Sequence, residues 1–173
     1  GEALYAIINI AERRAKKVPL DLLRAPEERQ LDATRIMFPF DLEAINLLVE
    51  LIDDVEPDLR IGAAYGLGGV GAVTALTAIS TQLSIEVEDD VQTAQTYAIA
   101  QLVEAGATEG LVFLRNQFKR LSSPDAKIAA LGVLTHFQPA LNQVCFESAI
   151  ESADERLRQM GLLGLAQCKN ENA

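Results

Sequence analysis

Apolar residues recur along the chain at the spacing of an α-helix, and one such pattern occurs four times in the same register. The helix that opens with DLRIGAAYGLG at Asp58 carries apolar or small residues at the anchor Leu59 and at 4, 7, 8 and 11 positions after it. Positions with this spacing share one face of a helix with about 3.6 residues per turn. The equivalent segments begin at Asp90, Asp125 and Glu155, and their anchors are Val91, Ala126 and Leu157.

Another amphipathic segment precedes each of these helices, so the predicted repeating unit is a pair of helices. The anchors are 32, 35 and 31 residues apart, a length that two helices and their turns can fill. An acidic residue or a proline opens each second helix, where a carboxylate can accept free backbone N–H groups and Pro fits the first turn. The first helices of the four pairs are predicted over residues 41–55, 72–85, 108–121 and 141–152.

Stacked helix pairs with this period are typical of repeat proteins, in which each unit contacts only its neighbours. The sequence therefore predicts an all-α fold, a right-handed αα-superhelix (α-solenoid) of about four helix pairs. An amphipathic helix over residues 3–17 and a short helix over residues 27–37 are expected before the pairs. The predicted divisions are an N-terminal helical cap or degenerate repeat at 1–40 and repeats at about 41–71, 72–106, 107–138 and 139–168.

The second helix of each pair resembles the HEAT repeat, an armadillo-type fold, and is most similar to the short HEAT repeats of phycobilisome lyase-like proteins. An acidic start, an apolar–basic pair, a small residue at position 4 and a small–apolar pair at positions 7 and 8 carry the resemblance. The stretch EPDLRIGAAYGLGGVG matches best, while Gln92, Gln95 and Ala126 depart from the pattern. The resemblance implies a concave face lined by the second helices. For the lyase-like relatives it implies help in attaching a bilin to a phycobiliprotein.

The stretch GLGGVG at 66–71 also matches the G-x-G-x-x-G fingerprint of a dinucleotide-binding loop. Glu86 even follows at the distance expected of a ribose-binding acid. However, the same register recurs in three segments that cannot form such a loop, and the chain lacks the strand–helix alternation of a parallel sheet. We therefore expect Gly66 to allow close helix packing and residues 68–71 to end the helix and turn the chain. No cofactor is predicted.

Catalytic and metal-binding motifs are not recognisable in the sequence. Its one histidine, His136, and Cys145 lie on different predicted helices, and nothing in their spacing requires contact, so Cys145 is expected in the core. The acidic clusters lack the glycine-bearing order of an EF-hand loop, so no metal site is predicted.

The uncharged span between Arg60 and Glu86 is long enough to cross a bilayer. Its several Gly, Ser, Thr and Gln residues favour a buried hairpin instead.

Negative charge is concentrated in the middle of the chain, whose formal net charge is −10. Between residues 36 and 114, thirteen acidic residues accompany a single basic one, Arg60. Such a surface repels nucleic acid and anionic membranes but suits a basic protein partner. In a stack of helix pairs the acidic turns would merge into one acidic rim. Its candidate partner-binding residues are Asp53, Asp54, Glu86 and Glu88.

The side of the second helices that faces away from the predicted core is expected to be exposed on the concave surface. It comprises the positions 2, 5, 6 and 9 residues after each anchor. Tyr65 and Tyr97 occupy equivalent positions in successive units and should lie side by side, and tyrosine is a common anchor at interfaces. The other candidate partner-binding residues on this face are Ile61, Thr93, Ile128 and Leu163.

Taken together, these features predict a non-enzymatic scaffold or adaptor that binds a protein partner, with a basic partner favoured. The alternative, which comes from the family resemblance, is a phycobilisome lyase-like subunit or chaperone that assists bilin attachment. The two cysteines do not form a disulfide framework and no signal peptide is recognised, so a cytoplasmic location is expected.

Overall fold

The computed structural model describes residues 42–171, and within this range the chain is helical and contains no strand. The predicted N-terminal cap at 1–40 lies outside the described residues. Eight α-helices and three short 3₁₀ segments follow one another in the described part. They are α4 (Leu42–Glu50), α5 (Pro57–Gly69), a 3₁₀ segment (Val73–Ala75), α6 (Leu76–Leu83), α7 (Asp89–Glu104), α8 (Glu109–Gln117), a 3₁₀ segment (Phe118–Arg120), α9 (Pro124–His136), a 3₁₀ segment (Pro139–Asn142), α10 (Gln143–Ile150) and α11 (Glu155–Glu171).

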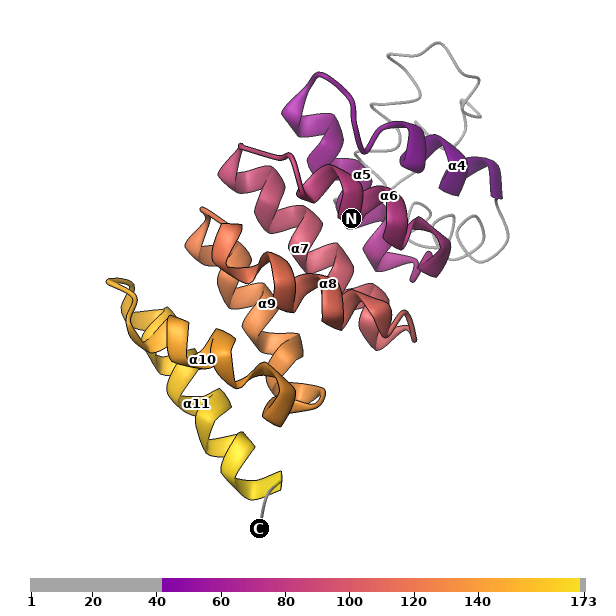
Figure 1. Ribbon diagram of the computed structural model, residues 1–173. Helices are drawn as coiled ribbons and strands as arrows, with labels where there is room; N and C mark the ends of the chain where they lie inside the picture. Colours follow the sequence, from indigo (N-terminus) through magenta and orange to yellow (C-terminus); the bar gives the residue numbers. More distant parts are fainter. Residues whose placement is uncertain (1–41, 172–173) are drawn as a thin grey trace, which may run out of the picture.

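The helices form four consecutive pairs at the places that the repeating pattern predicts. In each pair a shorter first helix packs against a longer second one: α4 against α5, α6 against α7, α8 against α9, and α10 against α11. The second helices also pack in chain order, because α7 contacts both α5 and α9, and α9 contacts α11. Figure 1 shows the pairs one after another, with the turn inside each pair on the same edge of the molecule. The first helix α4 ends at Glu50, earlier than the predicted residue 55.

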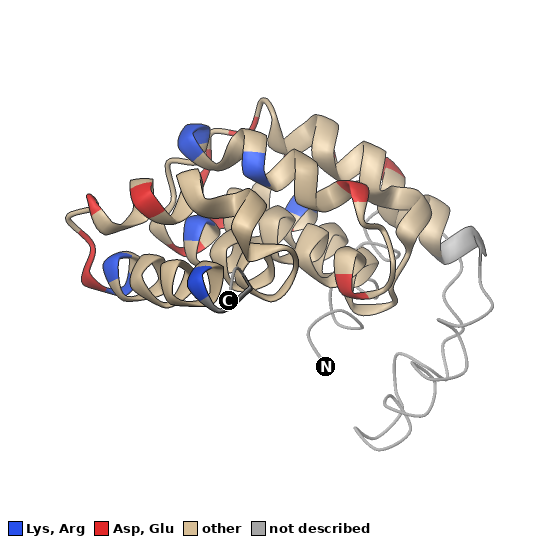
Figure 2. Ribbon diagram, turned by 60° about the horizontal axis from the view of Figure 1, so that its bottom comes forward, with Lys and Arg blue, Asp and Glu red and all other residues tan. Residues whose placement is uncertain are grey.

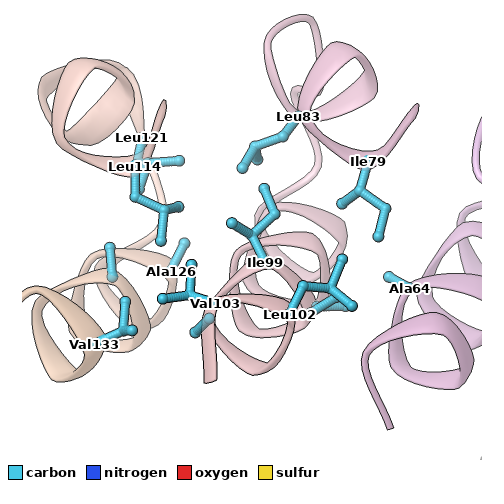
Figure 3. Close-up of a cluster of buried hydrophobic side chains, with 14 of the residues drawn as sticks. Ala64, Ile79, Leu83, Ile99, Leu102, Val103, Leu114, Leu121, Ala126 and Val133 are labelled. Carbon is cyan, nitrogen blue, oxygen red and sulfur yellow. The ribbon is translucent and has the colours of Figure 1, made fainter. Parts of the chain in front are cut away.

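The core lies at the positions that the periodicity predicts. Leu67, Ile99 and Leu134, each eight positions after an anchor, are fully buried. Figure 3 shows side chains from successive helices converging, with Ile99 of α7 and Leu83 of α6 pointing toward one another. Burying one such side chain contributes about 1.5–3 kcal/mol. The described part of the chain is therefore all-α, and its helices are held together by contacts between apolar faces.

On the second helices, the residue five positions after the anchor is buried in the first three pairs, although we expected this position to be exposed. Ala64, Thr96 and Leu131 are each 0% exposed, whereas Leu162, at the same position of α11, is 60% exposed. The helices α5, α7 and α9 are each in contact with the second helix that follows, whereas within the described residues no helix follows α11. The expectation was wrong at this position because a helical wheel represents one helix and does not include the helices that pack against it.

The glycines of GLGGVG serve packing and turning, as predicted. A Cβ at Gly66 would stand 2.9 Å from the Leu48 side chain of α4, and one at Gly68 would stand 2.8 Å from the Cα of Ala98 in α7. Gly71, in the turn after α5, has a φ of 64°, a left-handed value that suits glycine. The stretch is the end of a helix, and it does not form the strand and loop of a dinucleotide site.

Candidate protein-binding surface

A buried ion pair between Arg60 and Glu86 joins the turns of the first two helix pairs. Nε of Arg60 donates to one Glu86 carboxylate oxygen at 2.8 Å, and Nη2 donates to the other at 3.1 Å. The remaining nitrogen, Nη1, donates to the main-chain carbonyls of Asp54 at 2.8 Å and Val55 at 3.3 Å. The two ionic side chains are only 10% and 3% exposed. Because the two-point contact is directional, one arginine fixes the α4–α5 turn against the α6–α7 turn.

Glu86 therefore does not belong to an exposed acidic rim, contrary to our expectation. Besides Arg60, its carboxylate accepts the N–H groups of Val87 at 3.0 Å and Glu88 at 3.1 Å. Burial by itself raises the pKa of this carboxyl, but the guanidinium and the two amides outweigh burial and hold the pKa below its usual value of 4.5. Glu86 is thus charged at neutral pH, and its contacts are structural.

Gln92, one position after its anchor like Arg60, links the second turn to the third. Its Nε2 donates to the main-chain carbonyl of Glu86 at 2.9 Å, and its Oε1 accepts the N–H of Ser122 at 3.0 Å. The predicted pattern has a basic residue at this position, but Gln92 makes a similar contact, because a side-chain amide can both donate and accept hydrogen bonds. It bonds a carbonyl six residues earlier, as Arg60 does, and also reaches the following turn.

Further contacts tie the third and fourth pairs into the same edge. The hydroxyl of Thr93 lies 2.8 Å from that of Ser123, and the latter also accepts the N–H of Ala126 and so caps α9. Arg156 of α11 pairs with Asp125 of α9 at 2.7 Å on the surface. We call this surface, visible along one side of Figure 1, the turn edge. It comprises the turns within the four pairs, at 51–56, 84–88, 121–123 and 151–154.

Acidic side chains line the outer surface of the turn edge at the first two turns. Asp53 and Glu88 are exposed, as predicted. Asp54 is half-buried, and its carboxylate accepts the N–H of Glu56 at 3.0 Å. Figure 2 shows that acidic residues, in red, lie mostly at helix ends and in connecting turns. Three of the four candidate rim residues thus remain at least partly accessible, and Glu86 does not.

Three aliphatic residues beside these acids are exposed, and the sequence pattern did not predict them as surface residues. Val55 is 91% exposed, Ile85 70% and Val87 78%. Val55 and Ile85 are the last residues of the predicted helices at 41–55 and 72–85, so only Val87 was expected in a turn, where an aliphatic residue has no helix face on which to reach the core. Arg60 bonds both the main-chain carbonyl of Val55 and the carboxylate of Glu86, so one buried ion pair connects the backbone at Val55 with the stretch that carries Ile85 and Val87. We call Val55, Ile85 and Val87 the aliphatic patch.

A shallow hollow lies next to the aliphatic patch, toward the third helix pair. Its volume is about 400 Å³, and Ile85, Val87 and Arg120 are among the residues that line it. Gln117 closes one side by donating from Nε2 to the hydroxyl of Ser84 at 3.1 Å. The hollow is large enough to receive an apolar side chain from a bound segment.

Tyr65 of α5 and Tyr97 of α7 lie side by side, as the register predicts. Their ring centroids are 6.0 Å apart and the ring planes make an angle of 63°, which is an edge-to-face arrangement. Tyr97 is 47% exposed and Tyr65 is half-buried. Leu163, at the same position of α11, is exposed. The other candidates of this face, Ile61, Thr93 and Ile128, are half-buried.

Cys145 belongs to the core, as predicted. It is buried, its thiol donates to the carbonyl of Arg115 at 3.7 Å, and burial raises the pKa of the thiol, which disfavours a reactive thiolate. His136 is exposed, with its ring centroid 6.3 Å from that of Phe137.

In the described range, no three His, Cys, Asp or Glu side chains converge as a metal site. No helix there combines the length and apolar character needed to cross a membrane.

No protein-family model matches this sequence, and no curated protein is significantly similar to it. Two surfaces remain as candidates for a function: the turn edge and the tyrosine face of the second helices, which comprises Tyr65, Tyr97, Leu163, Ile61, Thr93 and Ile128.

Proposed function

We propose that the chain is a non-enzymatic scaffold or adaptor, a HEAT-like α-solenoid that binds a protein partner through its tyrosine face and its turn edge. Two features support the solenoid: the pattern of the second helices repeats four times, and each of these helices packs against the next. A stack of this kind presents a preorganised surface, which lowers the conformational entropy lost on binding. The tyrosine face would then line the concave side.

The Tyr65–Tyr97 pair is the observation that carries this proposal. Tyr97 leaves 47% of its surface accessible while its ring contacts a second ring at 6.0 Å. Tyrosine supplies a large amphipathic contact area, and a ring already held by a neighbour loses little further freedom when a partner binds. An aromatic pair that is partly exposed on two helices packed against each other is therefore well suited to anchor a protein contact.

The test is to capture a partner with the chain as bait, to purify that partner and to measure its affinity by titration calorimetry. Tyr97→Ala should weaken binding at least tenfold, the loss typical of an interface anchor. Val112→Ala is the matched control, because Val112 of α8 is 50% exposed and lies outside the tyrosine face. Equal affinities of wild type and Tyr97→Ala for the partner would show that the tyrosine face is not the binding surface. The bilin-related alternative is tested separately by adding a free bilin and recording its absorbance, which should not change.

A further inference from the structure

The backbone that carries the aliphatic patch is linked by the polar contacts of the Arg60–Glu86 ion pair. Nη1 of Arg60 bonds the carbonyl of Val55 at 3.3 Å, and its Nε and Nη2 bond Glu86, which stands between Ile85 and Val87. The N–H of Val87 in turn donates to Glu86 at 3.0 Å. The side chains are exposed, but their backbone is fixed by a buried ion pair. Such a rigid apolar surface offers contact area at little entropic cost to a partner.

The charge around the patch identifies the kind of partner that fits it. Six acidic residues of the two turns and of the helix starts that follow are exposed: Asp53, Glu56, Asp58, Glu88, Asp89 and Asp90. Between positions 36 and 114 the only basic residue is Arg60, whose charge is paired with Glu86 inside the turn edge. Arg120 of the third helix pair is exposed and lines the adjacent hollow, so the acidic surroundings belong to the first two turns. Basic side chains next to apolar ones would therefore meet complementary charge here, whereas phosphate and anionic lipid would be repelled.

We propose that the first two turns of the turn edge bind a basic amphipathic segment of a partner protein. Its aliphatic side chains rest on Val55, Ile85 and Val87, and one of them enters the adjacent hollow of about 400 Å³. Its Lys and Arg side chains face the acidic residues of the two turns. The inference rests on the proposed function, since it specifies the chemistry of a protein partner, but it concerns a surface separate from the tyrosine face.

The probe is a fluorescent helical peptide with Leu on one face and Lys on the other, and its binding is measured by fluorescence anisotropy. We expect saturable binding that weakens as salt rises, because the Debye length shortens to about 8 Å at physiological ionic strength. Replacing the aliphatic patch by Ser (Val55→Ser, Ile85→Ser, Val87→Ser) should weaken binding roughly tenfold. A control protein with Val73→Ser, Val112→Ser and Val144→Ser removes valines that are 42%, 50% and 61% exposed elsewhere, and it should bind like wild type.

Two control peptides separate apolar contact from charge. A Ser/Lys peptide, which keeps the charge and lacks the apolar face, and a Leu/Glu peptide, which reverses the charge, should both bind at least tenfold more weakly. Failure of the Leu/Lys peptide to bind would overturn the inference. So would equal binding by the patch variant, or equal binding by the Ser/Lys peptide. If Tyr97→Ala abolishes peptide binding and the patch variant does not, the inference fails while the proposed function stands. Circular dichroism of each variant establishes that it is folded.

Discussion

At the scale of single residues, the buried Arg60–Glu86 pair is the clearest case in which a charge has a structural use. A buried ion pair does not by itself guarantee net stability, because both groups lose their hydration. Breaking the pair by removing one partner is nevertheless costly, since the other charge is left buried without compensation. If Glu86 is replaced, the remaining charge is that of Arg60. Its Nη1 would still donate to the carbonyls of Asp54 and Val55, but its Nε and Nη2 would no longer have a carboxylate acceptor.

Glu86→Gln should lower the free energy of unfolding at pH 7 by roughly 2–3 kcal/mol, because a neutral amide replaces a buried, charge-paired carboxylate. The effect should depend on pH. The folded pKa of Glu86 lies below its unfolded value near 4.5, so its contribution is present above that value and is lost as the pH falls through the folded pKa. The difference between wild type and variant, measured by urea denaturation, should therefore narrow from pH 7 to pH 3.

Glu88→Gln is the matched control for this experiment, because Glu88 is an exposed carboxylate two residues away. It should change the free energy of unfolding at pH 7 by less than about 0.5 kcal/mol. A difference between wild type and Glu86→Gln that stays constant from pH 7 to pH 3 would contradict the structural role of the carboxylate.

At the scale of the helices, small residues decide how closely the second helices approach. Gly68 and Gly69 are consecutive residues of α5 with different surroundings. A Cβ at Gly68 would meet the Cα of Ala98 at 2.8 Å, and it would also collide with the side chain of Gln101. At Gly69 the same atom would have nothing within 4 Å. The contact between α5 and α7 thus depends on one glycine and not on its neighbour.

Gly68→Ala should destabilise the fold by about 1–3 kcal/mol, because a methyl group is forced against the backbone of α7. Gly69→Ala should leave stability unchanged or raise it by up to about 1 kcal/mol, because alanine restricts the unfolded chain and favours helix. Chemical denaturation of the two variants measures both effects. Equal effects of the two substitutions would contradict the close approach of α5 and α7.

At the scale of the whole molecule, the same register position has a different environment at the end of the row of second helices. Leu131 of α9 and Leu162 of α11 both stand five positions after their anchors. The first is 0% exposed because α11 packs on α9, and the second is 60% exposed. The burial of this position therefore depends on the packing of one second helix against the next and not on the sequence pattern of a single helix pair.

Leu131→Ala should cost about 2–4 kcal/mol, since it removes apolar contacts and leaves a cavity between α9 and α11. Leu162→Ala should change the free energy of unfolding by no more than about 0.5 kcal/mol. Thermal or urea unfolding of the two variants provides the comparison. Similar losses from both would mean that the flank of α11 is covered in solution.

Much of the fold follows from the sequence because it is local and periodic. The four helix pairs and the core positions eight residues after Leu59, Val91 and Ala126 follow from apolar spacing, which reflects the geometry of a single helix. The proximity of Tyr65 and Tyr97 also follows, because the two residues occupy equivalent positions of successive second helices, which pack against each other. The role of the GLGGVG glycines follows from comparing that stretch with the other three units.

The remaining features were decided only by the tertiary structure, because they depend on contacts between groups far apart in the chain. Glu86 is buried by Arg60, which lies 26 residues earlier, and the sequence alone shows merely another acid in an acidic turn. Thr96 and Leu131 are buried by the next second helix, which the wheel of one helix cannot include. The contact between the Val55 turn and the Ile85–Val87 turn likewise depends on Arg60 and Glu86, which are far apart in the sequence. Local periodicity determined which residues form helices and core, and contacts between successive helix pairs determined which surfaces remain accessible to a partner.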